Sequence, residues 1–171
     1  MKKINLTASG TLYENLQELP NEDRKLMEAA IEATKNSYAP YSQFKVGAAL
    51  LMEDDSIIMG SNQENAAYPS GMCAERVAIW KAGATFPNKK VKKIAITANS
   101  SNKTVDKPVG PCGACRQTLL EYEINQEKSI EILFMGEVGK IVKAESIVAL
   151  LPFPLTVLTC NEIGYSIESR S

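Results

Sequence analysis

Hydrophobic and polar positions along the chain follow two periods, which predict helices and strands in turn. From residue 21 onward, apolar residues recur at helical spacing on one face of a predicted helix. These residues are Leu26, Met27, Ala30, Ile31 and Ala33. Asn21 is placed to cap this helix, and Glu22 and Asp23 suit the positive end of its dipole. Pro40, in "SYAPYS", predicts that the helix ends before it.

The segment "FKVGAALLMEDDSIIMGSN" predicts a β-hairpin, because two apolar runs near residues 44–52 and 56–61 flank acidic turn residues. The pattern then predicts a helix from Cys73 to about Ala82, a buried strand in "VKKIAITA" and a helix from Cys112 to about Tyr122. Two further strands, "IEILFM" and "KIVKA", and a short helix, "ESIVALL", follow.

This order of elements predicts the α/β class, with a mixed sheet covered by helices on its faces. Only "GEVG" separates the last two strands, whereas parallel neighbours need a crossover of about a dozen residues or more. The last two strands should therefore form an antiparallel hairpin. We expect a three-layer α/β/α arrangement around a mixed five-stranded sheet.

The length of 171 residues suits one domain with an ordinary core and is short for two. No repeat, low-complexity segment or linker divides the chain. We expect an N-terminal extension over residues 1–20, a domain over residues 21–158 and a C-terminal tail over residues 159–171. Apolar residues at 44% and charged residues at 23% are ordinary values for soluble globular proteins.

Composition also limits location and partners. The start, "MKKINLTASG", lacks the apolar region of a signal peptide, and no later stretch is long and apolar enough to span a membrane. We therefore expect a cytoplasmic protein with no membrane partner, in which four cysteines stay reduced. A net charge of -1 gives no general attraction to nucleic acid, and the lysines of "NKKVKK" are interpreted as the solvated start of a strand. A small molecule is the expected partner.

The stretch "GPCGACRQ" places Cys112 and Cys115 about one helical turn apart. Pro111 suits the first position of a helix, and thiols at a helix N-terminus meet its positive end, which favours the thiolate. A redox pair, a metal site and core packing are all compatible with this pair, and a metal site is favoured.

A second stretch, "YPSGMCAERVAIW", places Cys73 at the head of another helix, with Glu75 two residues further on. Three thiols at helix N-termini can converge on one ion, and thiolates suit zinc. Three protein ligands leave a fourth position for water, as in catalytic zinc sites. The chain has no histidine, and Cys160, in "VLTCNE", is interpreted as a core or surface thiol.

Three thiolates leave a zinc site with a net negative charge, which opposes ionisation of bound water. Arg76, Arg116 and Gln117 are placed to donate hydrogen bonds to the sulfurs and offset that charge. The alternative is that they are surface polar groups. Glu75 is the natural proton carrier, because a carboxylate beside zinc-bound water can take its proton and pass it to a leaving group.

The pairing of "CAE" with a distant "PCGAC" matches the zinc deaminase signature. With "SYAPYSQFKVGAAL" and "GSNQENAAYPSGMCAER", the chain resembles the small homotetrameric cytidine deaminases over about residues 25–152. The resemblance implies a cytidine deaminase-like fold and one zinc per chain, held by Cys73, Cys112 and Cys115, with Glu75 as the catalytic residue. It also implies a homotetramer in which subunits can share active sites.

The resemblance further implies contacts with a pyrimidine nucleoside. Phe44 would pack on the base, Asn62 and Glu64 would bind the ribose hydroxyls, backbone groups of Ala74 and Glu75 would hold the base edge, and Tyr68 would line the site near a subunit interface. From the residues alone, a core position is favoured for Phe44, and turn positions are favoured for Asn62 and Glu64.

Two positions depart from the family pattern. Gln63 stands where the family usually has an aliphatic residue, and Phe153, after "LLP", aligns only loosely with the phenylalanine that reaches a neighbouring subunit's site.

The implied reaction is hydrolytic deamination of cytidine and 2′-deoxycytidine to uridine and 2′-deoxyuridine, with release of ammonia, in pyrimidine salvage. Relatives that act on polynucleotides typically place a helix between the last two core strands, so the short connection favours a free nucleoside. Two alternatives stay open. One is deamination of another cytosine nucleoside, such as an aminoacyl-nucleoside antibiotic. The other is a non-catalytic zinc or thiol-redox domain, which would leave Glu75 without a role.

Overall fold

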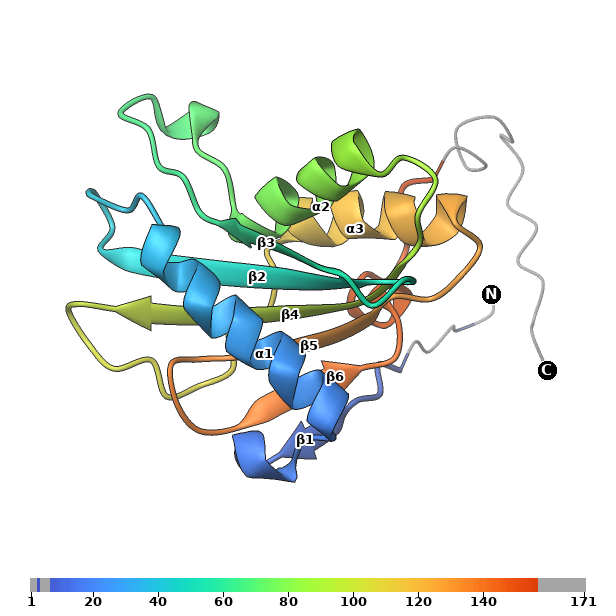
Figure 1. The fold of residues 1–171 in the computed structure, drawn as a ribbon, viewed down its shortest axis with the longest axis horizontal. Coiled ribbons are helices and arrows are strands. Elements are labelled where there is room, and N and C mark those ends of the chain that lie inside the picture. Colours follow the sequence, from blue (N-terminus) through green and yellow to red (C-terminus); the bar gives the residue numbers. More distant parts are fainter. Residues whose placement is uncertain (1–2, 4–6, 157–171) are drawn as a thin grey trace.

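A computed structural model describes residue 3 and residues 7–156. In this part of the chain, a mixed sheet has the strand order β1-β6-β5-β4-β2-β3 (Figure 1). The strands are β1 (Thr11–Tyr13), β2 (Phe44–Met52), β3 (Ile57–Ser61), β4 (Val91–Ser100), β5 (Glu131–Met135) and β6 (Ile141–Ala144). The α-helices are α1 (Asn21–Ala33), α2 (Ala74–Thr85) and α3 (Gly113–Asn125). Short 3-10 helices are η1 (Leu16–Glu18), η2 (Thr34–Asn36), η3 (Tyr68–Ser70) and η4 (Ile147–Leu150).

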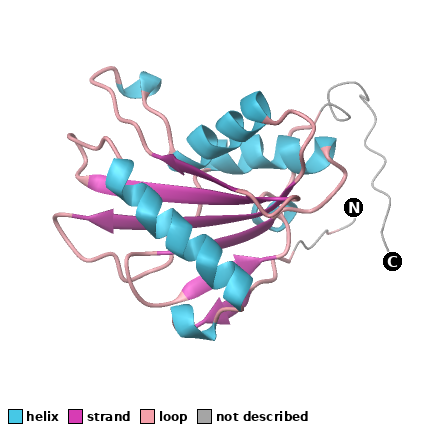
Figure 2. Ribbon diagram, in the orientation of Figure 1, coloured by secondary structure: helices cyan, strands magenta, loops and turns pink. Residues whose placement is uncertain are grey.

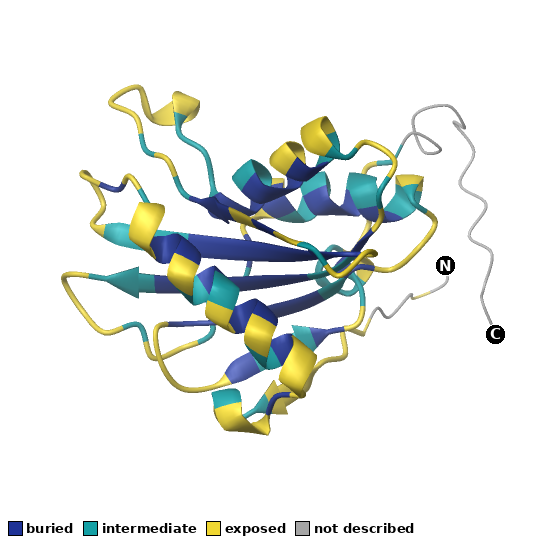
Figure 3. Cartoon of the chain, viewed as in Figure 1, coloured by how far each residue is buried: buried dark blue, intermediate teal, exposed yellow. Residues whose placement is uncertain are grey.

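The helices cover the two faces of the sheet, as Figure 2 shows. Alternate residues of β2 point to opposite faces, so Ala48 and Leu50 pack toward α2 and α3, while Ala49 and Leu51 pack toward α1. The sheet between the helices is the most deeply buried part of the molecule (Figure 3). The predicted α/β class and its three layers are confirmed. Among the described residues, no helix combines the length and apolar character that crossing a bilayer requires.

The predicted count of five strands is wrong, because a short strand from the N-terminal segment joins the sheet. β1 pairs antiparallel with β6, with Thr11 opposite Lys143 and Tyr13 opposite Ile141. Leu19, further along the same segment, is 4% exposed and lies in the core beneath α1. The predicted hairpin is confirmed, since β5 and β6 are antiparallel, while β4 and β5 are parallel.

The starts of α1, α2 and α3 differ by one residue from the sequence predictions. The N-cap of α1 is Pro20, without a side-chain cap, and Asn21 is already helical. The Asn21 Oδ1 instead accepts a hydrogen bond from Arg24 Nη2 at 3.0 Å. Cys73 and Cys112, each predicted as the first residue of a helix, are the N-caps of α2 and α3, and Pro111 precedes the N-cap of α3. Both cysteine-bearing helices thus begin immediately after a cysteine.

Gly60 allows α2 to lie unusually close to β3. A Cβ atom at this position would come within 2.6 Å of the Ala74 carbonyl oxygen and 2.5 Å of the Ala78 amide nitrogen. Any side chain would therefore push the first turns of α2 away from the sheet. This contact fixes the helix end that carries Cys73 and Glu75.

A buried carboxylate fixes the first turn of α1 to the sheet. Asp23 is fully buried, and its two oxygens accept hydrogen bonds from Lys93 Nζ of β4 at 2.6 Å and Lys143 Nζ of β6 at 2.7 Å. Glu131 of β5 lies 2.6 Å from Lys143 Nζ. Burial by itself raises the pKa of Asp23, but the hydrogen bonds from Lys143 and Lys93 outweigh it and lower that pKa. The network therefore requires ionised Asp23.

We expect Asp23→Asn to lower the free energy of unfolding by about 3 kcal/mol, because it leaves buried lysine charge without its partner. Urea denaturation at neutral pH measures this change. The pKa of Asp23 is lower in the folded chain than in the unfolded chain, so its stabilisation is complete above the unfolded value. It should be lost as the pH falls below about 4.

Asp54→Asn is the matched control, since Asp54 forms a solvent-exposed ion pair with Lys89. Its effect on unfolding should be much smaller. Equal effects of the two substitutions would show that the buried position of Asp23 is unimportant.

Candidate active site

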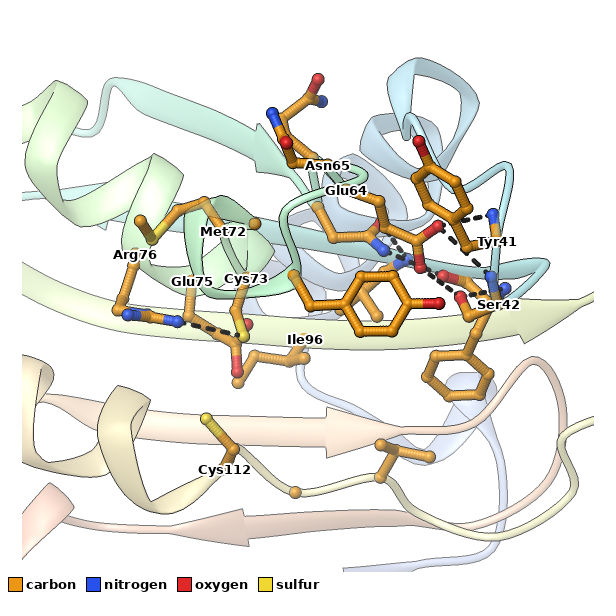
Figure 4. A pocket seen from close by; sticks show the side chains of 18 residues that line it. Tyr41, Ser42, Glu64, Asn65, Met72, Cys73, Glu75, Arg76, Ile96 and Cys112 are labelled. Carbon is orange, nitrogen blue, oxygen red and sulfur yellow. Dashed lines mark hydrogen bonds between the residues drawn. The ribbon is translucent and has the colours of Figure 1, made fainter.

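A cavity of about 800 Å³ opens at one end of the sheet, where the helices that bear the cysteines begin (Figure 4). Its walls come from the start of β2, the segment between β3 and α2, the first turn of α2, the middle of β4 and the loop before α3. Polar groups and thiols from distant parts of the sequence therefore face one space.

Three thiols converge where α2 and α3 begin, and two of them, Cys73 and Cys112, line this cavity. Cys73 is the N-cap of α2, Cys112 is the N-cap of α3, and Cys115 lies in the first turn of α3. Their sulfur atoms all lie within 4.8 Å of one another. A tetrahedral zinc ion with Zn–S bonds of about 2.3 Å would hold sulfurs roughly 3.8 Å apart. The donor set and its spacing therefore fit zinc.

The surroundings of Cys73 and Cys115 shift the pKa values of these two thiols in opposite directions. Hydrogen bonds from Cys115 and Arg76 lower the pKa of Cys73 to about 5. The same hydrogen bond raises the pKa of Cys115, because its thiol donates the proton and is also buried. At least one metal-binding thiolate is thus favoured at neutral pH, which is the form that zinc requires.

Glu75 lies in the first turn of α2, two residues after Cys73, and lines the cavity. It is only 4% exposed. Burial is the main cause that raises the pKa of this carboxyl group. The side chain can therefore hold a proton inside the site, beside the thiols.

The residues predicted to donate to sulfur divide into two groups. Arg76 Nη2 donates to Cys73 Sγ at 3.6 Å. The structure differs from the prediction for Arg116, which donates from Nε to Pro111 O and from Nη1 to Leu150 O, both at 2.9 Å. Gln117 likewise donates to Leu155 O at 2.8 Å. These hydrogen bonds attach the end of η4 and the segment after it to α3.

Asn62 and Glu64, predicted to bind ribose, both line the cavity and are held by protein groups. The Asn62 amide accepts from Val46 N at 2.8 Å and donates to Phe44 O at 2.9 Å. Glu64 accepts from Tyr41 N at 2.9 Å and from the Ser42 hydroxyl. The hydrogen bond from Ser42 contributes most to lowering the pKa of Glu64, so the group is an ionised acceptor.

The other residues predicted to contact the nucleoside differ in how deeply they are buried. Phe44 is half-buried in the cavity wall, whereas Tyr68 is 74% exposed at its rim. Ala74 is completely buried at the start of α2 and contributes no side chain to the wall of the described cavity. Phe153 is 74% exposed and does not line this cavity either. Cys160 falls outside the described residues.

The sequence left other lining residues unassigned. Tyr41 and Ser42 lie at the mouth of the cavity, and the Tyr41 and Tyr68 ring centroids are 5.9 Å apart. Tyr41 and Ser42 both belong to "SYAPYS", which carried part of the resemblance, so the sequence held a signal for these two residues. Met72, Ile96 and Val109 supply apolar wall without any local sequence signal.

Residues 20–128 match the family model described as the cytidine and deoxycytidylate deaminase zinc-binding region. The chain belongs to this deaminase family. A protein of Halalkalibacterium halodurans named cytidine deaminase is 40% identical over 137 residues, which cover 80% of this chain and 96% of that protein. A cytidine deaminase of Sporosarcina psychrophila is 44% identical over 98 residues, covering 57% of this chain and 68% of the relative.

Solved structures of cytidine deaminases are similar to this chain in fold and sequence. The crystal structure of cytidine deaminase from Burkholderia pseudomallei has a TM-score of 0.67 at 36% identity and covers 77% of this chain and 97% of its own. That from Mycobacterium tuberculosis has a TM-score of 0.60 at 28% identity, with coverage of 78% and 96%. The family predicted from "CAE" and "PCGAC" is confirmed, as are the fold, the hydrolytic deaminase class and the zinc cofactor.

We expect Cys112→Ser to weaken zinc binding strongly, because it removes one of three sulfur ligands. Metal analysis of the purified protein should give about one zinc per chain for the unsubstituted protein and far less for the variant. Cys160→Ser is the matched control and should leave the zinc content unchanged. Full zinc content in Cys112→Ser would contradict the ligand set.

Proposed function

We propose that this deaminase hydrolyses cytidine and 2′-deoxycytidine to uridine and 2′-deoxyuridine, with release of ammonia. The observation that carries the proposal is the buried carboxyl group of Glu75, which lines the cavity together with Cys73 and Cys112, two of the three converging thiols. A metal site alone would not require a proton carrier at its inner wall. Relatives named cytidine deaminase support the choice of base.

In this proposal, Cys73, Cys112 and Cys115 hold the zinc ion. When bound, zinc supplies a water molecule whose pKa is lowered enough to act as a nucleophile near neutral pH. Glu75 accepts the proton of that water and gives it to N3 of the pyrimidine, which makes C4 more electrophilic. Once the oxygen of that water has added to C4, Glu75 takes the remaining proton from this oxygen and gives it to the amino group. The C4–N bond then breaks, ammonia leaves, and C4 keeps the oxygen as a carbonyl.

The proposed substrate contacts follow the cavity wall. Phe44 would cover the pyrimidine, and backbone groups of Ala74 and Glu75 would hold its edge. Glu64 and Asn62 would meet the ribose hydroxyls. Glu64 is suited to this, because hydrogen bonds from Tyr41 and Ser42 already fix the direction of its carboxylate.

Charge on the cavity wall supports a nucleoside over a nucleotide. Among the described residues that line it, Arg76 is the sole cation, and its guanidinium is directed at the Cys73 sulfur. No second basic side chain is placed there to receive a phosphate group. The antiparallel β5–β6 hairpin, typical of nucleoside deaminases, supports the same choice.

We further infer a cytoplasmic enzyme of pyrimidine salvage that works as a homotetramer. The exposed position of Tyr68 on the rim supports a neighbouring subunit beside the site. The catalytic domain is proposed to span residues 21–158, between an extension over residues 1–20 and a tail over residues 159–171.

Glu75→Gln should keep about one zinc per chain and lose turnover by a factor of at least about 100, because an amide cannot shuttle protons. The loss of cytidine absorbance on conversion to uridine measures turnover, and metal analysis measures zinc. Glu28→Gln, at an exposed position of α1, is the matched control and should leave both unchanged.

Several results would contradict the proposal. Undiminished turnover in Glu75→Gln would end the proton-carrier role. Zinc-loaded protein that leaves cytidine and 2′-deoxycytidine unchanged would refute the substrate. Activity on an aminoacylated cytosine nucleoside in its place would then identify the alternative enzyme, and no deamination at all would favour a binding domain.

The proposed assembly predicts a particle of about four times the 18.7 kDa of one chain. Sedimentation velocity at micromolar concentration measures this mass. Tyr68→Ala should then raise the KM for cytidine, because Tyr68 stands at the rim of the cavity. A fully active monomer would contradict shared sites.

A further inference from the structure

Arg76 carries the positive charge nearest the sulfurs, yet few groups hold its guanidinium. Nη2 donates to Cys73 Sγ at 3.6 Å. Nε is buried and has no hydrogen-bond partner within the described part of the chain. No carboxylate among the described residues forms an ion pair with Arg76. Arg76 also interacts with Cys115, but contacts with sulfur alone would leave a long side chain free to turn toward solvent.

The second group that holds Arg76 is the ring of Trp80. The guanidinium carbon lies 5.8 Å from the ring centroid, within the range of a cation–π contact. Cys73, Arg76 and Trp80 follow one another at spacings of three and four residues along α2, so they share one face of the helix. Because helical side chains lean toward the N-terminus, Trp80 leans toward Arg76, and Arg76 leans toward Cys73.

Trp80 has a position that the hydrophobic core alone does not explain. It is the one tryptophan of the chain, and it is 43% exposed. A planar aromatic face restricts a guanidinium to a narrow range of orientations, because the planar cation stacks on the ring and is attracted to its electron density. Fixing Arg76 in this way keeps a positive charge beside thiolates whose combined charge exceeds that of a divalent ion.

We propose that Trp80 is a positioning residue of the zinc centre, which holds Arg76 against Cys73. Trp80 touches neither zinc nor nucleoside in this proposal and acts through Arg76. The inference rests on the zinc site of the proposed function. It predicts that the arginine of the "CAER" segment is held in place only when an aromatic ring stands four residues later, at residue 80.

The experiment compares Trp80→Leu, which removes the ring face, with Trp80→Phe, which keeps one. The rate of zinc release to a colorimetric chelator is measured for each purified protein, together with kcat and KM for cytidine. Trp80→Leu should release zinc about 2- to 5-fold faster than the unsubstituted protein, the change expected for loss of one partly exposed cation–π contact. Trp80→Phe should restore most of the retention. The KM for cytidine should change little, since Trp80 does not line the cavity.

Phe86→Leu is the matched control. It removes another ring in a cation–π contact, with Lys89 Nζ 4.4 Å from the ring centroid, at the opposite end of α2. Zinc release from Phe86→Leu should match that of the unsubstituted protein. Faster release from Phe86→Leu, equal to that from Trp80→Leu, would overturn the proposal, because general loosening of α2 would then explain both.

A double-mutant cycle separates positioning from packing. In an Arg76→Met background, Trp80→Leu should cause no further acceleration of zinc release, because the side chain on which Trp80 acts is gone. An undiminished effect in that background would refute the proposal. Zinc release does not depend on the substrate, so this result stands even if cytidine is not deaminated, and failure of the substrate assay is distinguished from failure of this inference.

Discussion

The convergence of two helix N-termini is the constraint on which the site depends. Thiolates are stabilised where a helix presents unpaired N–H groups, and Cys73 and Cys112 occupy the N-caps of α2 and α3. For their sulfurs to lie within 4.8 Å, the two helices must begin at the same end of the sheet and on the same face. The close approach of α2 to β3 at Gly60 supports this arrangement, since a bulkier residue would move Cys73 and the carboxyl group of Glu75 together.

The opposite face of the sheet depends on a different kind of interaction. α1 carries no proposed catalytic group, and its N-terminal end is joined to β4 and β6 by Asp23. These hydrogen bonds are directional and reach two different strands, so they tie the first turn of α1 to a defined place on the sheet. The face of the sheet that carries α2 and α3 therefore holds the three thiols, whereas the face that carries α1 holds the buried ion pairs of Asp23.

Local signals predicted much of this structure, and the remainder depended on contacts between distant residues. The cysteine-headed helices followed from the position of Pro111 and the helical pattern, and the β5–β6 hairpin followed from the length of its connection. Asp23, by contrast, meets partners 70 and 120 residues away, which no local pattern shows. Arg116 is long enough to reach a sulfur or a carbonyl oxygen, and the position of η4 brings the Leu150 carbonyl oxygen within its reach. β1 was missed because its three residues are too few for a periodic signal.

β1 also limits the pairing of this sheet with strands of other protein molecules. Without β1, the outer edge of β6 would expose a row of unpaired backbone groups, and such edges template the pairing of strands between molecules. β1 satisfies these groups and presents an edge of only three residues, with Leu12 the one apolar residue that is largely exposed along it. A segment remote from the cavity thereby contributes to colloidal stability, which keeps the enzyme available for its chemistry.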